Sequence, residues 1–157
     1  MEALGAVGSI IAIVQISKTI ISVCQYYIDA ADSASSDLRY ILIEVSAVKG
    51  IAKSLQYLTE LSVTNSALLD QLAAVSGPIK GCENALKELE ALFPPAAVSV
   101  NGQRSKRGRL ETAVTALAWP SKIGKAKKLL QEIMQHKTTI NLALTAEFVY
   151  VQVCIIE

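Results

Sequence analysis

The chain has 157 residues, of which 52% are hydrophobic and 18% charged, and it holds one His, three Cys, one Trp, five Tyr and two Phe. This length corresponds to a single domain, and the apolar content excludes a disordered or solvating segment. Because the apolar residues are mainly Ala, Leu, Ile and Val, and Gly and Pro are few, we expect helices and no β-sandwich.

The net charge of +1 conceals an asymmetry along the chain. Residues 1–100 carry six basic and ten acidic side chains, whereas residues 101–157 carry nine basic and four acidic ones. A basic segment of this kind can steer a surface toward an anionic partner. Cys24, Cys82 and Cys154 are isolated and have no CxxC spacing, so we expect reduced, cytosolic thiols and neither a zinc site nor a disulfide framework.

The first predicted helix runs from residue 3 to about Ala30. Its second half has a polar stripe made of Gln15, Lys18, Ser22 and Gln25. Residues 3–14 have no such stripe, because Ser9 is their only polar residue. An all-round apolar helix suits either the centre of a bundle or contact with lipid.

Small residues also gather on one side of this first segment, where they would let another helix come close. They are Gly5, Gly8, Ser9 and Ala12. Residues 3–17 are uncharged, but 15 helical residues span only about 22 Å, short of the ~30 Å hydrocarbon core. A permanent transmembrane anchor is therefore not expected.

Two further helices follow, each with a core stripe. The second begins near Ser36 or Asp37, and its stripe is Leu38, Ile41, Val45, Val48, Ala52 and Leu55, widened by Leu42 and Leu58. The third stripe is Leu68, Leu72, Val75, Ile79, Cys82, Leu86, Leu89 and Phe93. Its heptad phase survives Gly77–Pro78, so we expect one long helix that is bent or briefly interrupted at the proline and stopped by Pro94–Pro95.

The last third of the chain begins with a basic loop. A short helix over residues 110–119 is expected to end at Pro120, and Ser121 to cap a final helix. The final stripe is Ile123, Ala126, Leu130, Ile133, Ile140 and Leu144, interrupted by Lys137. The β-branched run from Phe148 is interpreted as a boundary within a longer protein, with a weak strand or an apolar interface as alternatives.

The basic residues of this part form two neighbouring groups. They are Arg104, Lys106, Arg107 and Arg109, then Lys122, Lys125, Lys127 and Lys128. The first group fits nucleic-acid contact, nuclear import, attraction to anionic lipid or a solvated loop. No aromatic residues are interleaved with it, which disfavours binding of single-stranded nucleic acid. At about 1 kcal/mol per basic residue near an anionic membrane, the two groups could hold the chain at a cytoplasmic leaflet.

The sequence shows no pattern of residues typical of catalysis. The sole histidine, His136, lies mid-helix and has no nucleophile signature to serve, so we expect it to be exposed or to cap a helix. We predict no catalytic, cofactor-binding or metal-binding residue and no enzymatic activity.

Three stretches resemble the N-terminal HeLo-like domain of fungal STAND proteins, which are also called NLR-like proteins. They are the opening MEALGAVGSIIAIVQIS, the spaced Leu and Val of residues 38–58, and ALAWPSKIGKAKKLLQEIMQHKTTINLAL at 116–144, with its Trp119-Pro120 pair. The resemblance implies a helical bundle placed before a nucleotide-binding oligomerisation module or an amyloid motif. It also implies a cell-death effector that acts on membranes through its N-terminal helix.

Carried onto this sequence, the resemblance assigns roles to two groups of residues. The lipid-seeking side chains are Leu4, Val7, Ile10, Ile11, Ile13 and Val14, and helix packing in a pore falls to Gly5, Gly8 and Ala12. The charge pattern, not the resemblance, predicts anionic-lipid contact by Arg104, Lys106, Arg107, Arg109, Lys122 and Lys125.

We therefore predict an all-α bundle of about five helices, as one domain over residues 1–157. Its expected function is membrane association and pore formation, triggered when a downstream module in the same protein oligomerises. The expected partners are anionic membrane lipid and further copies of the chain, not nucleic acid, and the protein would be cytoplasmic at rest and at the plasma membrane when active. The alternative is a non-lytic signalling adaptor whose first helix stays in the core.

Overall fold

The computed structural model describes the backbone of residues 2–30, 36–61, 66–93 and 106–156, and the side chains of residues 3–29, 36–60, 70–93 and 121–146. Every element in these ranges is an α-helix. They are α1 (Glu2–Ala30), α2 (Ser36–Leu61), α3 (Ser66–Ala74), α4 (Ser76–Glu90) and α6 (Lys106–Ile156). The predicted all-α bundle with a long N-terminal apolar helix is confirmed.

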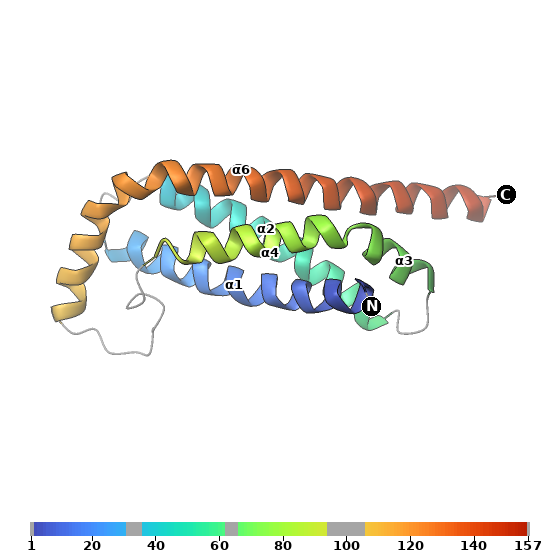
Figure 1. Cartoon of the computed structure of the whole chain (residues 1–157), viewed down its shortest axis with the longest axis horizontal. Coiled ribbons are helices and arrows are strands. Elements are labelled where there is room, and N and C mark those ends of the chain that lie inside the picture. Colours follow the sequence, from blue (N-terminus) through green and yellow to red (C-terminus); the bar gives the residue numbers. More distant parts are fainter. Residues whose placement is uncertain (1, 31–35, 62–65, 94–105, 157) are drawn as a thin grey trace.

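Four of the helices form the bundle. Figure 1 shows α1, α2, α4 and the straight part of α6 running along the long axis of the molecule, while the short α3 lies at one end. Successive long helices run in opposite directions, so the beginning of α1 lies at the same end as the last turns of α2 and the beginning of α4. The main contacts join α1 to α2, α1 to α4, and α4 to α6.

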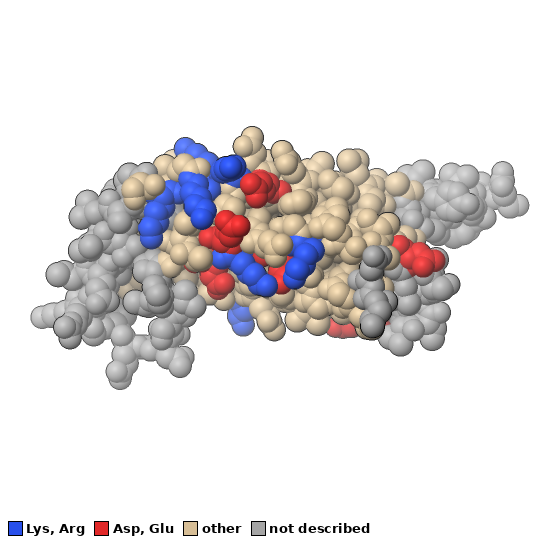
Figure 2. Space-filling model, in the orientation of Figure 1, with Lys and Arg blue, Asp and Glu red and all other residues tan. Residues whose placement is uncertain are grey.

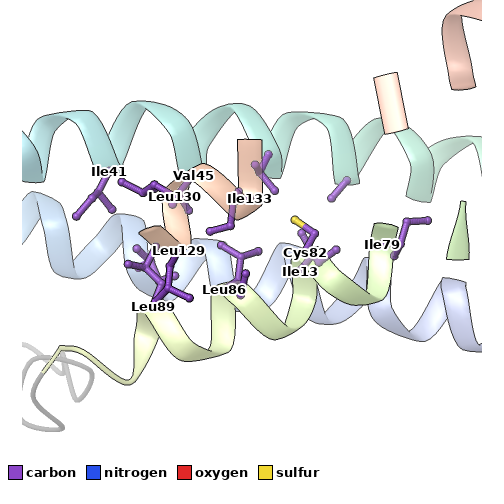
Figure 3. Close-up of a cluster of buried hydrophobic side chains, with 14 of the residues drawn as sticks. Ile13, Ile41, Val45, Ile79, Cys82, Leu86, Leu89, Leu129, Leu130 and Ile133 are labelled. Carbon is purple, nitrogen blue, oxygen red and sulfur yellow. The ribbon is translucent and has the colours of Figure 1, made fainter. Parts of the chain in front are cut away.

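The core consists of aliphatic side chains from all four helices, which Figure 3 shows converging between the ribbons. The whole predicted core stripe of α2 is buried, from Leu38 at 8% exposure to Val45 at 0%. Leu72, Val75, Ile79, Cys82, Leu86, Leu89 and Phe93 of the third stripe are also buried. The heptad patterns therefore identified the faces that pack, apart from Leu68, whose side chain lies outside the described residues.

The third stripe is carried by two helices with a short break between them. Val75 has φ −100° and ψ 7°, and the turn there separates α3 from α4. Pro78 falls in the first turn of α4, where its missing N–H costs no intrahelical hydrogen bond. Val75 N still donates to Gln71 O, and Ile79 N to Val75 O, so the heptad phase passes through the break as predicted.

The prediction that a helix ends at Pro120 is wrong. α6 continues from Lys106 to Ile156, so Ser121 does not begin a helix. Figure 1 shows this helix bending in its orange part before the long straight part. A proline inside a helix removes one hydrogen bond and pushes the preceding turn away, which bends a helix without necessarily ending it. The weak strand considered from Phe148 is also wrong, because these residues continue α6.

Candidate functional site

The first half of α1 buries one face and exposes the opposite one, and both faces are apolar. Ile10 and Ile13 are 1% and 3% exposed, whereas Leu4 is 75% and Ile11 41% exposed. Val7 and Val14 are half-buried. The predicted lipid-seeking residues are thus divided by the fold, since two lie in the core, two are half-buried and two face outward.

The glycines of this half of α1 have no close neighbour in the part of the chain that the structure describes. A Cβ added at Gly5 or Gly8 would meet no atom within 4 Å, while Ala12 is half-buried. Within the bundle these glycines therefore do not serve helix packing. Their predicted role in an assembly of several chains stays a prediction.

One buried carboxylate joins this half of α1 to α4. Glu83 is 4% exposed, and it accepts hydrogen bonds from Lys80 Nζ at 2.8 Å and Lys87 Nζ at 2.5 Å. Burial raises the pKa of Glu83, but hydrogen bonds from Lys80, Lys87 and the side chain of Ser9 outweigh it and lower the pKa from 4.5 to about 2. Glu83 is therefore ionised at neutral pH, and the side chain of Ser9 of α1 is one of its hydrogen-bond donors.

A hollow in the core adjoins the same half of α1. Residues of all four bundle helices line it: Ile10, Ile13, Val48, Ile51, Ala52, Leu55, Ile79, Cys82, Lys137 and Ile140. Apart from Lys137 these side chains are apolar or a thiol, so they offer a ligand no set of polar partners. Burial raises the pKa of Cys82 to about 12, which keeps this thiol protonated and unreactive.

Lys137 lies where the sequence pattern showed an interruption of the final stripe. Its Nζ is 2.7 Å from Glu44 Oε2, and the two side chains are only 20% and 14% exposed. The lysine therefore does not break the contact between α6 and α2, because a partly buried ion pair takes the place of one apolar contact. This pair is not predictable from the sequence, since nothing in the primary structure relates Glu44 to Lys137.

His136, on the adjacent position of α6, packs against α4. A Cβ added at Gly81 would lie 2.5 Å from both Cε1 and Nε2 of His136. The imidazole thus fills the space that the missing side chain of Gly81 leaves. The expected exposed or capping role is wrong, because His136 is half-buried and serves helix packing.

The predicted lipid-contacting lysines are engaged within the protein. Lys122 Nζ donates to the carbonyl oxygen of Leu92 at 2.9 Å and so binds the turn that follows α4. Lys125 Nζ lies 3.6 Å from Glu88, and both side chains are more than half exposed. Figure 2 shows blue side chains gathered over the beginning of the straight part of α6, with red ones beside them. Acidic neighbours therefore partly neutralise this surface.

The other four residues assigned to lipid contact cannot be placed in this way. Arg104 lies outside the described residues, and the side chains of Lys106, Arg107 and Arg109 in the first turns of α6 do so as well. Lys128 is exposed on α6 close to Lys125.

One described helix is long and apolar enough to cross a membrane, and it is α1 over Ala3–Asp29. Length and composition alone set this criterion, which the core helix of a soluble protein also meets. An 18-residue window of this helix is 39% buried, and several of its other apolar side chains are partly buried against the core. The exposed part lies in the first half, around Leu4 and Ile11.

No protein-family model, curated protein or solved structure matches this chain.

Proposed function

We propose that this chain is a membrane-targeting, pore-forming effector domain of the HeLo-like kind, activated by oligomerisation of a downstream module. In this proposal the first half of α1 leaves the bundle and inserts into lipid. The observation that carries it is the outward apolar face of the first half of α1, with Leu4 at 75% and Ile11 at 41% exposure. This half belongs to the helix that meets the length and composition criterion for a membrane span over Ala3–Asp29. The sequence resemblance to fungal STAND proteins supplies the biological setting, which is programmed cell death.

Three features of the resting bundle support release of this half of α1. Its outward face already meets water without a polar stripe. A small hollow beside Ile10 and Ile13, with room for about one water molecule, leaves a few of their packing contacts unmade. The polar tie to the bundle is the contact of Ser9 with Glu83, a single hydrogen bond whose net contribution is about 1 kcal/mol, or somewhat more because the acceptor is charged.

The basic residues would supply the attraction to anionic headgroups. The ion pair of Lys125 with Glu88 is long and exposed, and such pairs contribute about 0–1 kcal/mol. Lys125 can therefore exchange Glu88 for a lipid phosphate at little cost. Lys122 is a weaker candidate, because leaving Leu92 would free a carbonyl at the end of α4. Binding of this kind would place a cytoplasmic protein at the plasma membrane when it is active.

The second candidate is a non-lytic signalling adaptor that never releases α1. The observation that favours it is the depth at which α1 contributes to the core: Ile10, Ile13 and Ile20 are 1%, 3% and 0% exposed. Deletion of residues 1–17 would remove two of these residues. Such a truncated chain is expected to unfold under either proposal, so it does not separate them.

Substitutions on the outward face of α1 separate the two candidates. The full chain, fused to a domain that a small molecule oligomerises, is added to anionic liposomes filled with dye. Leu4→Glu with Ile11→Glu places two charges on the face that must enter lipid, while the buried face stays intact. The matched control is Leu142→Glu, because Leu142 is 66% exposed on α6.

If α1 inserts, the oligomerised wild type and the Leu142→Glu control release dye, and the Leu4→Glu/Ile11→Glu variant releases at least tenfold less. The three proteins should have the same helix content by circular dichroism and similar melting temperatures. Equal leakage from the three proteins, or no leakage from the oligomerised wild type, would reject the insertion of α1 and favour the adaptor.

A further inference from the structure

The face of α2 that points away from the core carries a second heptad stripe, here called the outward stripe. Its members follow one another at alternating steps of three and four residues, and all are exposed: Tyr40, Ile43, Ala47, Gly50, Ser54 and Tyr57. The buried stripe of α2 lies on the opposite side of the helix. α2 therefore shows a contact-type pattern on two faces. The bundle buries one of them, and the other meets α6 at Tyr40, whose hydroxyl donates to Met134 Sδ at 3.3 Å.

Three large side chains of the outward stripe are open to solvent. Tyr40, Ile43 and Tyr57 are 44%, 64% and 62% exposed. Single exposed apolar residues are ordinary on a protein surface, but these lie in one row that contains no charge over five helical turns. The exposed face of a bundle helix is normally its charged face, whereas the charges of α2 flank this row.

The outward stripe is complementary to itself when one copy is turned end for end. A tyrosine stands at each end, and the smallest residues, Ala47 and Gly50, stand next to its midpoint. In an antiparallel pair Tyr40 of one copy lies beside Tyr57 of the other. The small residues then let the two backbones approach at the centre, and a Cβ at Gly50 meets no atom of its own chain within 4 Å.

The flanking charges are complementary in the same arrangement. Arg39 and Glu60 are both exposed and lie on the same flank of the outward stripe, one near each tyrosine. The end-for-end turn brings Arg39 of each copy within side-chain reach of Glu60 of the other, so two opposite-charge pairs form. In a parallel pair the same flank of the two copies lies on opposite sides of the interface, so Arg39 of one copy could not reach Glu60 of the other.

We propose that the outward stripe of α2 is a self-association surface, on which a second copy of this chain docks as an antiparallel helix pair with Arg39 facing Glu60 of the second copy. One helix face offers less area than the roughly 800 Å² per partner of a standard interface. The dimer is therefore weak, with a dissociation constant in the micromolar range or above. It does not depend on insertion of α1, so either proposal can fail without the other.

Charge exchange tests the pairing directly, with sedimentation of the full chain at increasing concentration as the measurement. Arg39→Glu and Glu60→Arg should each weaken dimerisation several-fold, because each creates two like-charge contacts. The double variant Arg39→Glu/Glu60→Arg should restore it. Lys128→Glu, an exposed reversal on α6, is the control that should leave the dimer unchanged.

Cysteine pairing tests the orientation, in a chain in which Cys154 is replaced by Ser. Tyr40→Cys and Tyr57→Cys should give little disulfide-linked dimer separately and a heterodimer when mixed and oxidised. Crosslinking of either variant with itself would overturn the antiparallel arrangement.

The other occupants of this surface have their own outcomes. A wild-type chain that stays monomeric to hundreds of micromolar would overturn the proposal. If Ala47→Arg then lost binding to anionic liposomes, the outward stripe would be a lipid contact; if it bound as the wild type does, a different protein would be the occupant. All the substituted residues are exposed, so the melting temperatures of the variants should stay close to that of the wild type. A large loss of stability would show that α2 had been disturbed as a whole.

Discussion

The two halves of α1 bury similar side chains but differ in what they show to solvent. In the second half, Ile20, Val23 and Cys24 are buried, and Lys18, Ser22 and Gln25 are exposed, as in a typical bundle helix. In the first half, Ile10 and Ile13 are buried, but Leu4 and Ile11 occupy the outward face. The residues on the inner face of a helix are set by its packing in the bundle. Those on the outer face are set by what surrounds the bundle, which is water for the second half of α1 and can be lipid or protein for the first.

The surroundings of the two halves differ as well. The second half reaches Tyr27, whose ring lies 6.4 Å from that of Phe93 in a stacked arrangement. The first half borders the hollow and is tied to α4 by the contact of Ser9 with Glu83. We therefore expect the first half to be the easier one to detach.

Truncation of buried isoleucines should give the largest effect and tests this expectation. Ile10→Ala and Ile20→Ala each remove a side chain with at most 1% exposure, which typically lowers the free energy of unfolding by about 2–5 kcal/mol. We expect Ile20→Ala to reach that range and Ile10→Ala to fall at its lower end, as measured by urea denaturation. Equal losses would mean that both halves are held with the same firmness.

Acidification should weaken the tie between the first half of α1 and α4. Because the pKa of Glu83 in the folded chain is about 2, below its ordinary value of 4.5, its contribution is present above about pH 4.5 and is lost as the pH falls toward 2. At about 1.4 kcal/mol per pKa unit the whole shift amounts to about 3–4 kcal/mol. Most of it comes from Lys80 and Lys87 of α4 itself, and a smaller part from Ser9 of α1.

The measurement is the difference in unfolding free energy between the wild type and Glu83→Gln, followed from pH 6 to pH 2. The difference should shrink as the wild-type carboxylate is protonated. A difference that does not change with pH would show that Glu83 acts by its shape alone.

Filling the space at Gly81 should have a smaller, destabilising effect. Gly81→Ala places a Cβ against His136, and the displaced ring loses its packing; against the gain in helix propensity, we expect a net loss of about 1 kcal/mol. In the background His136→Ala the same substitution should become stabilising. The same sign in both backgrounds would contradict the contact.

The smallest effect is expected at Gly8, which has open space where Gly81 has a ring. Gly8→Ala should raise the unfolding free energy by up to about 1 kcal/mol, because alanine favours the helix and meets no neighbour. Gly124→Ala, also open and exposed on α6, should stabilise equally. If Gly8 packs helices in an assembled pore, only Gly8→Ala should also reduce dye leakage; a parallel effect of both would remove Gly8 from the pore.

Periodicity predicted the helices and their buried faces because burial in a bundle repeats with the helical turn. The start of α2 at Ser36 and the buried stripe from Leu38 to Leu55 agree with the prediction. The helix end predicted at Pro120 is wrong, because a proline does not say whether the surrounding packing holds a helix together. Neither the burial of Glu83 nor the engagement of Lys122 could be predicted, because each depends on a neighbour that only the fold supplies.

The candidate site was predictable in composition but not in geometry. The absence of a polar stripe in residues 3–14 pointed to an unusual segment, and the structure divides that segment into Ile10 and Ile13 inside and Leu4 and Ile11 outside. When a helix is apolar all round, its sequence does not show which side faces the bundle. The exposed apolar residues of α1 are therefore defined only by the positions of the neighbouring helices.

Adjacent residues of α6, His136 and Lys137, contact two different helices, α4 through Gly81 and α2 through Glu44. Heptad stripes repeat, so one aliphatic helix can slide along another by seven residues, about 10 Å, and find nearly the same contacts. The contact of the His136 ring with Gly81 and the ion pair of Lys137 with Glu44 each occur once and do not repeat along the helices. These two neighbours therefore fix the axial position of α6, and any sliding of this helix along the bundle has to undo both contacts in a single step.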